Sequence, residues 1–103
     1  MNFEVRRVIG ADHPSLPGHF PGAPVVPGVV ILDEIRAALG EWRQNCQVTI
    51  IPVAKFLVPL QPEQPFTICL FTVPDIEKEV EFCCRVDDRV IVEGRLQIRC
   101  GAN

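Results

Sequence analysis

The stretch of sequence that decides the fold runs from Gly18 to Asp33 and reads GHFPGAPVVPGVVILD. Its first eleven residues, 18–28, include three prolines and three glycines. Proline fixes the backbone φ angle and glycine permits tight turns, so this composition predicts a loop with one defined path. His19 lies in that loop and is the kind of side chain that exchanges protons near neutral pH. The loop is therefore a candidate for presenting a catalytic histidine.

A helix is expected from Gly28 to about Arg43, because Pro27 presets the backbone for a helix start. The first amides of a helix lack intrahelical acceptors, so they can stabilise negative charge that develops on a carbonyl oxygen. Asp33 shares a helix face with three small or apolar residues: Val29, Ala37 and Gly40. The stripe expected to pack on a sheet consists of Ile31, Leu32, Ile35, Ala38, Leu39 and Trp42.

The rest of the chain alternates apolar and polar residues with a period of two, which is typical of strands. Pro52 indicates a sheet edge or a bulge, and Asp87-Asp88 indicates a hairpin turn. One strand, one long helix and then several antiparallel strands predict an α+β domain whose curved sheet wraps around a central helix. The expected strands are Phe3–Ile9, Val48–Phe56, Phe66–Val73, Val80–Val86 and Val90–Cys100.

The composition of the chain predicts a single globular domain over residues 1–103, with 48% hydrophobic and 22% charged residues. The net charge of −3 and the absence of a basic stripe argue against a nucleic-acid-binding protein. The N-terminus lacks the apolar segment of a signal peptide, and no apolar run is long enough to span a bilayer. We therefore expect a cytoplasmic protein without a membrane span.

The five cysteines, an odd number, form no C-x-x-C pair and have no histidine at zinc-finger spacing. Most of them lie in apolar, strand-like segments, where a free cysteine behaves as a small hydrophobic residue. The sequence therefore predicts reduced, mostly buried thiols, with neither a zinc site nor a disulfide framework.

Residues 18–33 resemble the signature of the FabZ and FabA 3-hydroxyacyl-carrier-protein dehydratases. The shared features are the GHFPG step, the inner prolines, the Pro27-Gly28 step and a carboxylate at the position of Asp33. Residues 54–60, AKFLVPL, also resemble a strand and turn of that family. The resemblance extends from about Phe3 to Arg99 and is strongest within 18–33. It implies a hot-dog fold that works as a homodimer, and it leaves assembly beyond the dimer open.

The resemblance also implies the roles of individual residues. His19 would remove the α-proton of a 3-hydroxyacyl thioester, and Asp33 of the partner subunit would assist departure of the hydroxyl group as water. The amide of Gly28 would hold the thioester carbonyl. The remaining substrate-binding residues would be Phe20, Pro27 and Val29. No metal or organic cofactor is implied, and the acyl group would arrive on the phosphopantetheine of an acyl carrier protein or on coenzyme A.

Asp33 has further consequences for the chemistry. Once a second chain covers its face of the helix, burial would raise the pKa of its carboxyl group, as a proton donor near neutral pH requires. Glu34 competes for this role but lies on the charged flank of the helix. The family usually has glutamine at the position of Ala37, so the support that this glutamine would give to the carboxylate of Asp33 is missing.

Two alternative functions stay open: a thioesterase in which Asp33 activates water, and a non-catalytic acyl-binding or scaffold subunit that pairs with an active homologue.

Overall fold

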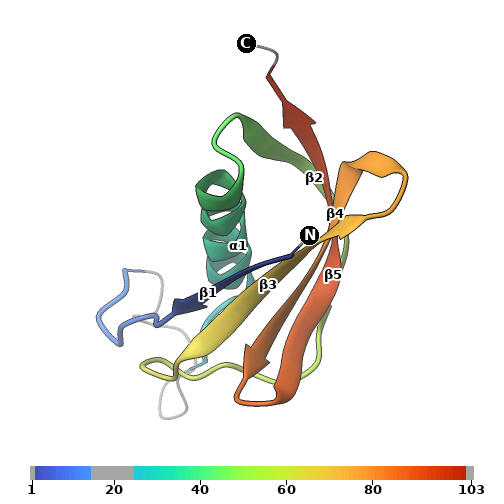
Figure 1. Ribbon diagram of the computed structural model, residues 1–103. Helices are drawn as coiled ribbons and strands as arrows, with labels where there is room; N and C mark the ends of the chain where they lie inside the picture. The colour runs from blue at the N-terminus through green and yellow to red at the C-terminus, as the bar shows by residue number, and fades with distance from the viewer. Residues whose placement is uncertain (1, 15–24, 102–103) are drawn as a thin grey trace.

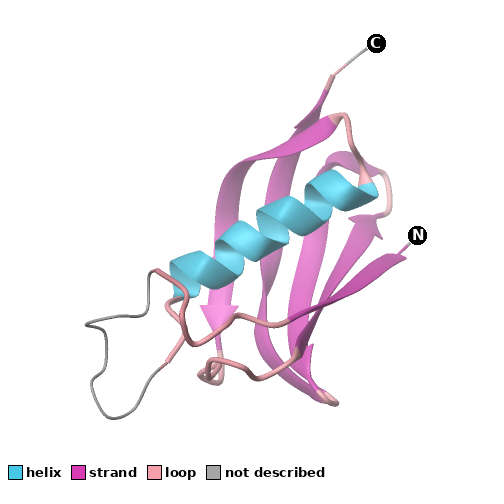
Figure 2. Ribbon diagram, turned by 90° about the vertical axis from the view of Figure 1, so that its left-hand side faces the viewer, coloured by secondary structure: helices cyan, strands magenta, loops and turns pink. Residues whose placement is uncertain are grey.

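One helix lies across the concave face of a curved, five-stranded antiparallel sheet (Figures 1 and 2). This computed structural model describes residues 2–14 and 25–101. The strand order in the sheet is β1-β3-β4-β5-β2. The architecture confirms the predicted α+β class. The elements in chain order are β1 (Asn2–Arg7), α1 (Gly28–Trp42), β2 (Cys46–Phe56), β3 (Phe66–Val73), β4 (Ile76–Val86) and β5 (Arg89–Cys100).

The core forms between α1 and the inner face of the sheet, the face that the helix covers. On the helix, the buried side chains are Val30, Ile31, Ile35, Ala38 and Leu39. All but Val30 belong to the predicted stripe, whose other members, Leu32 and Trp42, are partly buried against the core. The sheet contributes Ile68 and Leu70 from β3, and the remaining central strands contribute Val80, Phe82 and Leu96. Full burial of each large apolar side chain contributes about 2 kcal/mol, so this contact fixes the position of the helix on the sheet.

Two strands begin two or more residues before the starts that the sequence pattern predicted, whereas β1 ends at Arg7 rather than at Ile9. β4 begins at Ile76 rather than Val80, because the turn that precedes it is very tight. Asp75 has a left-handed backbone with φ of 64°, which lets the chain reverse directly from β3 into β4. The start of β4 has no apolar alternation, so its sequence gives no strand signal. β2 likewise begins at Cys46, two residues before the predicted start.

Strand β2 is an edge strand, paired on one side with β5. Its register shifts between Val48 and Ile50 and again between Ile50 and Val53, which confirms the bulge that Pro52 predicted. Its large apolar side chains are unusually exposed: Ile50, Val53 and Phe56 within the strand, and Leu57 after it. A long apolar edge of this kind is a template for pairing with another chain.

Strand β1 is attached to the helix by both aromatic and ionic contacts. Phe3 stacks on Trp42 with ring centroids 6.1 Å apart. Arg7 forms ion pairs with Glu34, at 2.9 Å, and with Glu41. Burial lowers the pKa of the Arg7 guanidinium, but the two carboxylates outweigh this effect and raise it overall. Along β1, the side chains of Phe3, Val5 and Arg7 are less exposed than those of the residues between them. This alternation agrees with the period of two that the sequence predicts for a strand.

The prediction that all cysteines are reduced is wrong for one pair. Cys46 and Cys100 form a disulfide between the first residue of β2 and the last residue of β5. They are directly opposite in the β2–β5 register. The two residues are 54 positions apart in the sequence, so only the register of the folded sheet reveals that they are partners.

Gly94 of β5 allows the close approach of two neighbouring elements. A Cβ atom at this position would collide with the backbone oxygen of Val53 and lie 2.7 Å from Cζ of Phe82. At Gly40, near the end of α1, a Cβ atom would meet no atom within 4 Å. The two glycines therefore offer a matched pair of substitutions with opposite expected effects.

We expect Gly94→Ala to lower the free energy of unfolding by about 3 kcal/mol, because the backbone of β2 must move. Gly40→Ala is expected to raise it by about 0.5–1 kcal/mol, because alanine restricts the unfolded chain and favours the helix. Urea unfolding followed by circular dichroism measures both changes. Equal stabilities for the two variants would contradict the packing described at Gly94.

Candidate functional site

The residues that the sequence singled out fall into two groups. Pro27, Gly28, Val29 and Asp33 lie at or near the start of α1 and are part of the described structure. The predicted catalytic His19 and the predicted substrate-binding Phe20 lie outside the described residues. The structure therefore gives the geometry of the helix start and of the chain segments on either side of residues 15–24.

The helix start is held firmly but is not capped by a side chain. Val26 is buried, and its amide donates a hydrogen bond to the carbonyl oxygen of Leu60 at 2.8 Å. Pro27 occupies the N-cap position with φ of −60° and ψ of 144°, and its carbonyl accepts a hydrogen bond from the amide of Val30 at 3.0 Å. Among the described residues, no acceptor faces the amides of Gly28 and Val29. Within residues 2–14 and 25–101, these two donors at the positive end of the helix therefore have no acceptor.

The segment 60–63 supports the chain on both sides of residues 15–24. On the C-terminal side of residues 15–24, the carbonyl oxygen of Leu60 accepts the hydrogen bond from the amide of Val26 described above. On the N-terminal side, the amide of Glu63 donates to the carbonyl of Ile9 at 2.8 Å, and its Oε2 accepts from the amide of Ala11 at 2.7 Å. Glu63 adopts a left-handed backbone with φ of 67°, which is uncommon for a residue with a side chain. Sequence reasoning missed Glu63, since only the fold brings it to Ile9.

Asp33 lies on the outward face of α1, one turn after Val29. Val29 is 63% exposed, and Asp33 and Ala37 on the same face are also exposed. No described residue forms an ion pair or hydrogen bond with Asp33. The methyl group of Ala37 cannot donate one. The structure thus confirms the predicted face of small and apolar residues around Asp33, and this face is open in the single chain.

Phe56, the last residue of β2, provides an apolar wall beside the helix start. Its ring carbons Cζ and Cε1 lie 2.8 and 3.0 Å from the position that a Cβ atom on Gly28 would take. A side chain at position 28 would displace this ring, whose end fills the space beside the glycine. Phe56 is itself 48% exposed, so it borders both Gly28 and solvent. Sequence reasoning quoted Phe56 within AKFLVPL but gave it no role in the site.

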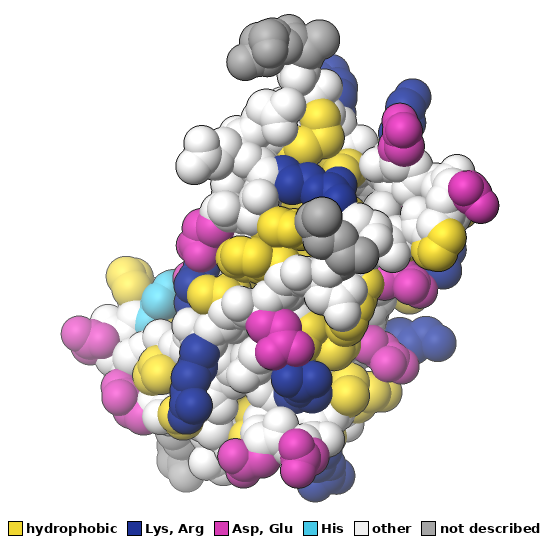
Figure 3. Space-filling view, in the orientation of Figure 1, with side chains coloured by type: hydrophobic (Ala, Val, Ile, Leu, Met, Phe, Trp, Pro, Cys, Tyr) yellow, Lys and Arg dark blue, Asp and Glu magenta, His cyan; other side chains and the backbone are white. Residues whose placement is uncertain are grey.

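The described residues give no sign of a metal centre, and the face seen in Figure 3 is not dominated by one charge. Within residues 2–14 and 25–101, no group of three or more His, Cys, Asp or Glu side chains is arranged to hold a metal ion. Figure 3 shows acidic and basic side chains interspersed on the face in view. Among the described residues, no helix is both long enough and apolar enough to cross a membrane.

Curated relatives with sequence similarity are FabZ 3-hydroxyacyl-[acyl-carrier-protein] dehydratases. The chain is 34% identical over 67 residues to the enzyme of Chlamydia trachomatis, which covers 55% of this chain and 44% of the relative. It is 47% identical over 32 residues to the enzyme of Haemophilus influenzae, which covers 31% of this chain and 22% of the relative. The matched region therefore spans less than half the length of either relative.

Solved structures support the same fold. The ApeI:P dehydratase heterocomplex from Xenorhabdus doucetiae matches with a TM-score of 0.81 and 20% identity, over 97% of this chain and 88% of the other. A probable thioesterase from Bartonella henselae matches with a TM-score of 0.73 and 14% identity, over 94% and 87% of the two chains. At these identities the likeness establishes the hot-dog fold alone.

The decisive match is to a protein family. The sequence of this chain fits the family described as ApeI-like, ApeI dehydratase, over residues 1–95. That region contains β1, α1, β2, β3 and β4, together with the helix start and Asp33. The chain belongs to the ApeI-like dehydratase family of hot-dog proteins.

Proposed function

We propose that this chain catalyses the dehydration of a 3-hydroxyacyl thioester to the trans-2-enoyl thioester. The observation that carries the proposal is the start of α1, where the amides of Gly28 and Val29 have no acceptor among the described residues and adjoin the exposed apolar side chains of Val29 and Phe56. Asp33 follows one turn later on the same outward face. Donors for a carbonyl oxygen and an apolar wall for an acyl chain thus lie together at the start of the helix, and the outward carboxylate is open to a second chain.

In the proposed reaction, His19 removes a proton from the carbon next to the thioester carbonyl. The amide of Gly28 stabilises the negative charge that then develops on the carbonyl oxygen. Asp33 of the partner subunit donates a proton to the 3-hydroxyl group, the carbon–oxygen bond breaks, and water leaves as the double bond forms. This elimination is redox-neutral, so it needs no redox cofactor. Phe20, Pro27 and Val29 line the acyl site in this proposal.

The site is completed by a second chain in the proposed assembly. The apolar edge of β2 favours pairing with another copy of the sheet, and the outward face of α1 at Asp33 is open to a neighbour. We infer that Asp33 of the partner subunit joins His19 of the first subunit at each site. The substrate carrier is a phosphopantetheine thioester, on an acyl carrier protein or on coenzyme A.

A second candidate function is that of a subunit without activity of its own that pairs with an active homologue. Two observations favour it: the similar structure from Xenorhabdus doucetiae is a dehydratase heterocomplex, and Ala37 provides no hydrogen bond to Asp33. A thioesterase is a further variant on the same fold, in which Asp33 would activate water.

Turnover of 3-hydroxyacyl thioesters tests the proposal. The wild-type chain is expected to form the conjugated enoyl product, which is followed by its ultraviolet absorbance. His19→Ala and Asp33→Asn are each expected to lower kcat/KM about a hundredfold or more, because a general base or acid is lost. His13→Ala and Asp88→Asn remove the same side-chain types outside the site and are the matched controls.

Three other outcomes would contradict the dehydratase proposal. Release of free thiol without enoyl product would indicate a thioesterase. Activity that appears only after mixing with a homologous subunit would indicate the partner role. Full activity in His19→Ala would exclude this histidine as the base.

The wall formed by Phe56 leads to a separate prediction. Phe56→Ala is expected to raise KM about tenfold while kcat changes less, because the lost apolar contact stabilises the bound acyl group before and during reaction. Ile76→Ala is the matched control, since Ile76 is similarly exposed but lies at the start of β4. Steady-state kinetics measures the two constants, and sedimentation checks that the assembly is unchanged. An unaltered KM in Phe56→Ala would remove this residue from the acyl site.

A further inference from the structure

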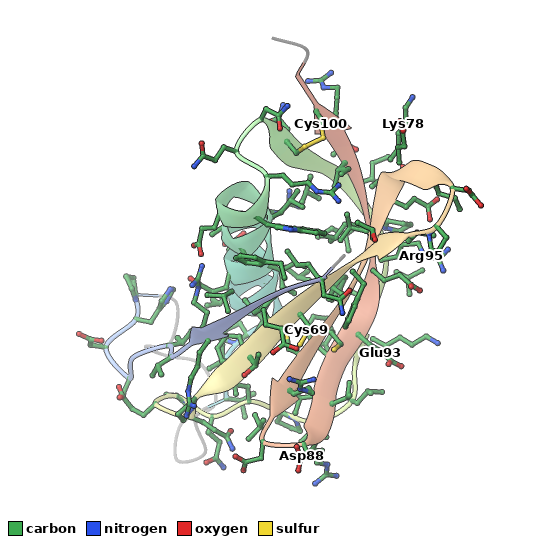
Figure 4. All side chains as sticks on the ribbon, in the orientation of Figure 1. Cys69, Lys78, Asp88, Glu93, Arg95 and Cys100 are labelled. Atoms are coloured by element: carbon green, nitrogen blue, oxygen red, sulfur yellow. A yellow bond between two sulfur atoms is a disulfide. The ribbon has the colours of Figure 1, made fainter. Side chains whose placement is uncertain are left out.

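The outer face of the sheet, which faces away from α1, carries a row of polar side chains across all five strands. Residues directly opposite one another in register are, from β1 to β2, Glu4, Cys69, Cys83, Glu93 and Lys55. Figure 4 shows Glu93 and Arg95 projecting from the sheet on the side opposite the helix. The proposed dehydration uses none of these residues. Two neighbouring thiols therefore lie in the middle of a face with no assigned role.

Cys69 and Cys83 are free cysteines that form a direct cross-strand pair. Side chains in such a pair have Cβ atoms about 4.5–5.5 Å apart, and the two thiols share a hydrogen bond. A disulfide needs Cβ atoms about 3.5–4.5 Å apart, so the two side chains must approach by only about 1 Å. The pair is thus close to the geometry of a disulfide without being one.

The two thiols differ in access to solvent. Cys69 is fully buried, whereas Cys83 is partly exposed and lines a groove of about 410 Å³ together with Phe71, Lys55 and Arg95. A small reagent can therefore reach Cys83 first. The groove holds both basic and acidic side chains, since Glu81 and Glu93 line it as well.

Cys69 has the properties of a thiol that reacts second. Desolvation by burial, followed by the neighbouring Cys83, raises the pKa of the Cys69 thiol to about 12. An ion pair between Glu4 and Arg85, at 3.6 Å, spans β3 beside it. Because the thiolate is the attacking form of a cysteine, this raised pKa leaves the first reaction with a peroxide to Cys83, and burial keeps Cys69 away from reagents in solvent. Cys69 is placed directly opposite Cys83 by the register of the sheet.

The third free cysteine, Cys84, is excluded from this chemistry. It follows Cys83 in β4, so its side chain points to the opposite face, where it is fully buried in the core. Burial raises the pKa of its thiol to about 12 as well. Cys69 is therefore the thiol available to Cys83 among the described residues.

The same sheet already accommodates a disulfide of the required kind. Cys46 and Cys100 are directly opposite each other on β2 and β5 and are joined. Figure 4 shows this bond at the end of the sheet near Cys100. Cys69 and Cys83 are also directly opposite each other, on the neighbouring strands β3 and β4. This antiparallel pairing is therefore compatible with a disulfide between them.

We propose that Cys83 and Cys69 form a peroxide-reactive dithiol site, which takes hydrogen peroxide or a small organic hydroperoxide and closes to a disulfide between β3 and β4. The thiolate of Cys83 attacks one peroxide oxygen, the oxygen–oxygen bond breaks, and Cys83 becomes a sulfenic acid while water, or an alcohol from an organic hydroperoxide, leaves. The sulfur of Cys69 then attacks the sulfur of Cys83, its thiol proton leaves with the hydroxyl group as water, and the sulfur–sulfur bond forms. Both cysteines are oxidised and the peroxide is reduced.

The test treats the purified full chain with an equimolar amount of hydrogen peroxide and follows it by intact mass and by non-reducing peptide mapping. The wild-type chain is expected to lose two hydrogen atoms and to yield a peptide linked between Cys69 and Cys83. Cys69→Ser, or Cys69→Ala if serine prevents folding, is expected to accumulate a sulfenic acid at Cys83 that dimedone traps. Cys83→Ser is expected to slow oxidation about tenfold or more.

Cys84→Ala is the matched control and is expected to form the same linked peptide at the wild-type rate. Circular dichroism establishes that each variant is folded. Stable sulfenic or sulfinic acid at Cys83 in the wild-type chain, without a linked peptide, would overturn the proposal. So would oxidation of Cys83→Ser at the wild-type rate, because the reactive thiol would then lie elsewhere. Neither result depends on dehydratase activity.

Discussion

Burial of the apolar stripe of α1 against the inner face of the sheet is the interaction on which the rest of the structure depends. Ile35, Ala38 and Leu39 are fully buried there, and the sheet supplies fully buried partners from its central strands. Since one face of the helix is committed to the core, the face that carries Val29 and Asp33 must point outward. The same contact places the start of α1 beside Phe56 at the end of β2, where no described residue accepts a hydrogen bond from the amides of Gly28 and Val29.

As a consequence of this arrangement, two surfaces of the single chain are left uncovered. The edge of β2 exposes apolar side chains and unpaired backbone groups, and the outward face of α1 exposes a carboxylate among small residues. Both are features that a second sheet and helix would cover. In the proposed function, assembly and catalysis are therefore linked, because covering Asp33 also changes the environment in which it must donate a proton.

The sequence was most informative where a local pattern determines the structure. The apolar spacing of α1, the Pro27-Gly28 helix start, the bulge at Pro52 and the turn at Asp87-Asp88 were all predicted and are confirmed. What it missed depends on how the fold brings distant segments of the chain together. The Cys46–Cys100 disulfide, the support of Ile9 by Glu63 and the contact of Phe56 with Gly28 join residues far apart in the sequence, and no local pattern marks them. The role of His19 stays a prediction.

The central claim is that each site combines His19 of one chain with Asp33 of the partner subunit, and mixed assemblies test it directly. His19→Ala and Asp33→Asn, each inactive alone, are co-expressed in equal amounts and assayed for dehydration. The account predicts recovery of about one quarter of wild-type activity, because random pairing makes half of the dimers mixed and each mixed dimer has one intact site. A mixture as inactive as its parents, despite sedimentation showing dimers, would contradict the shared site.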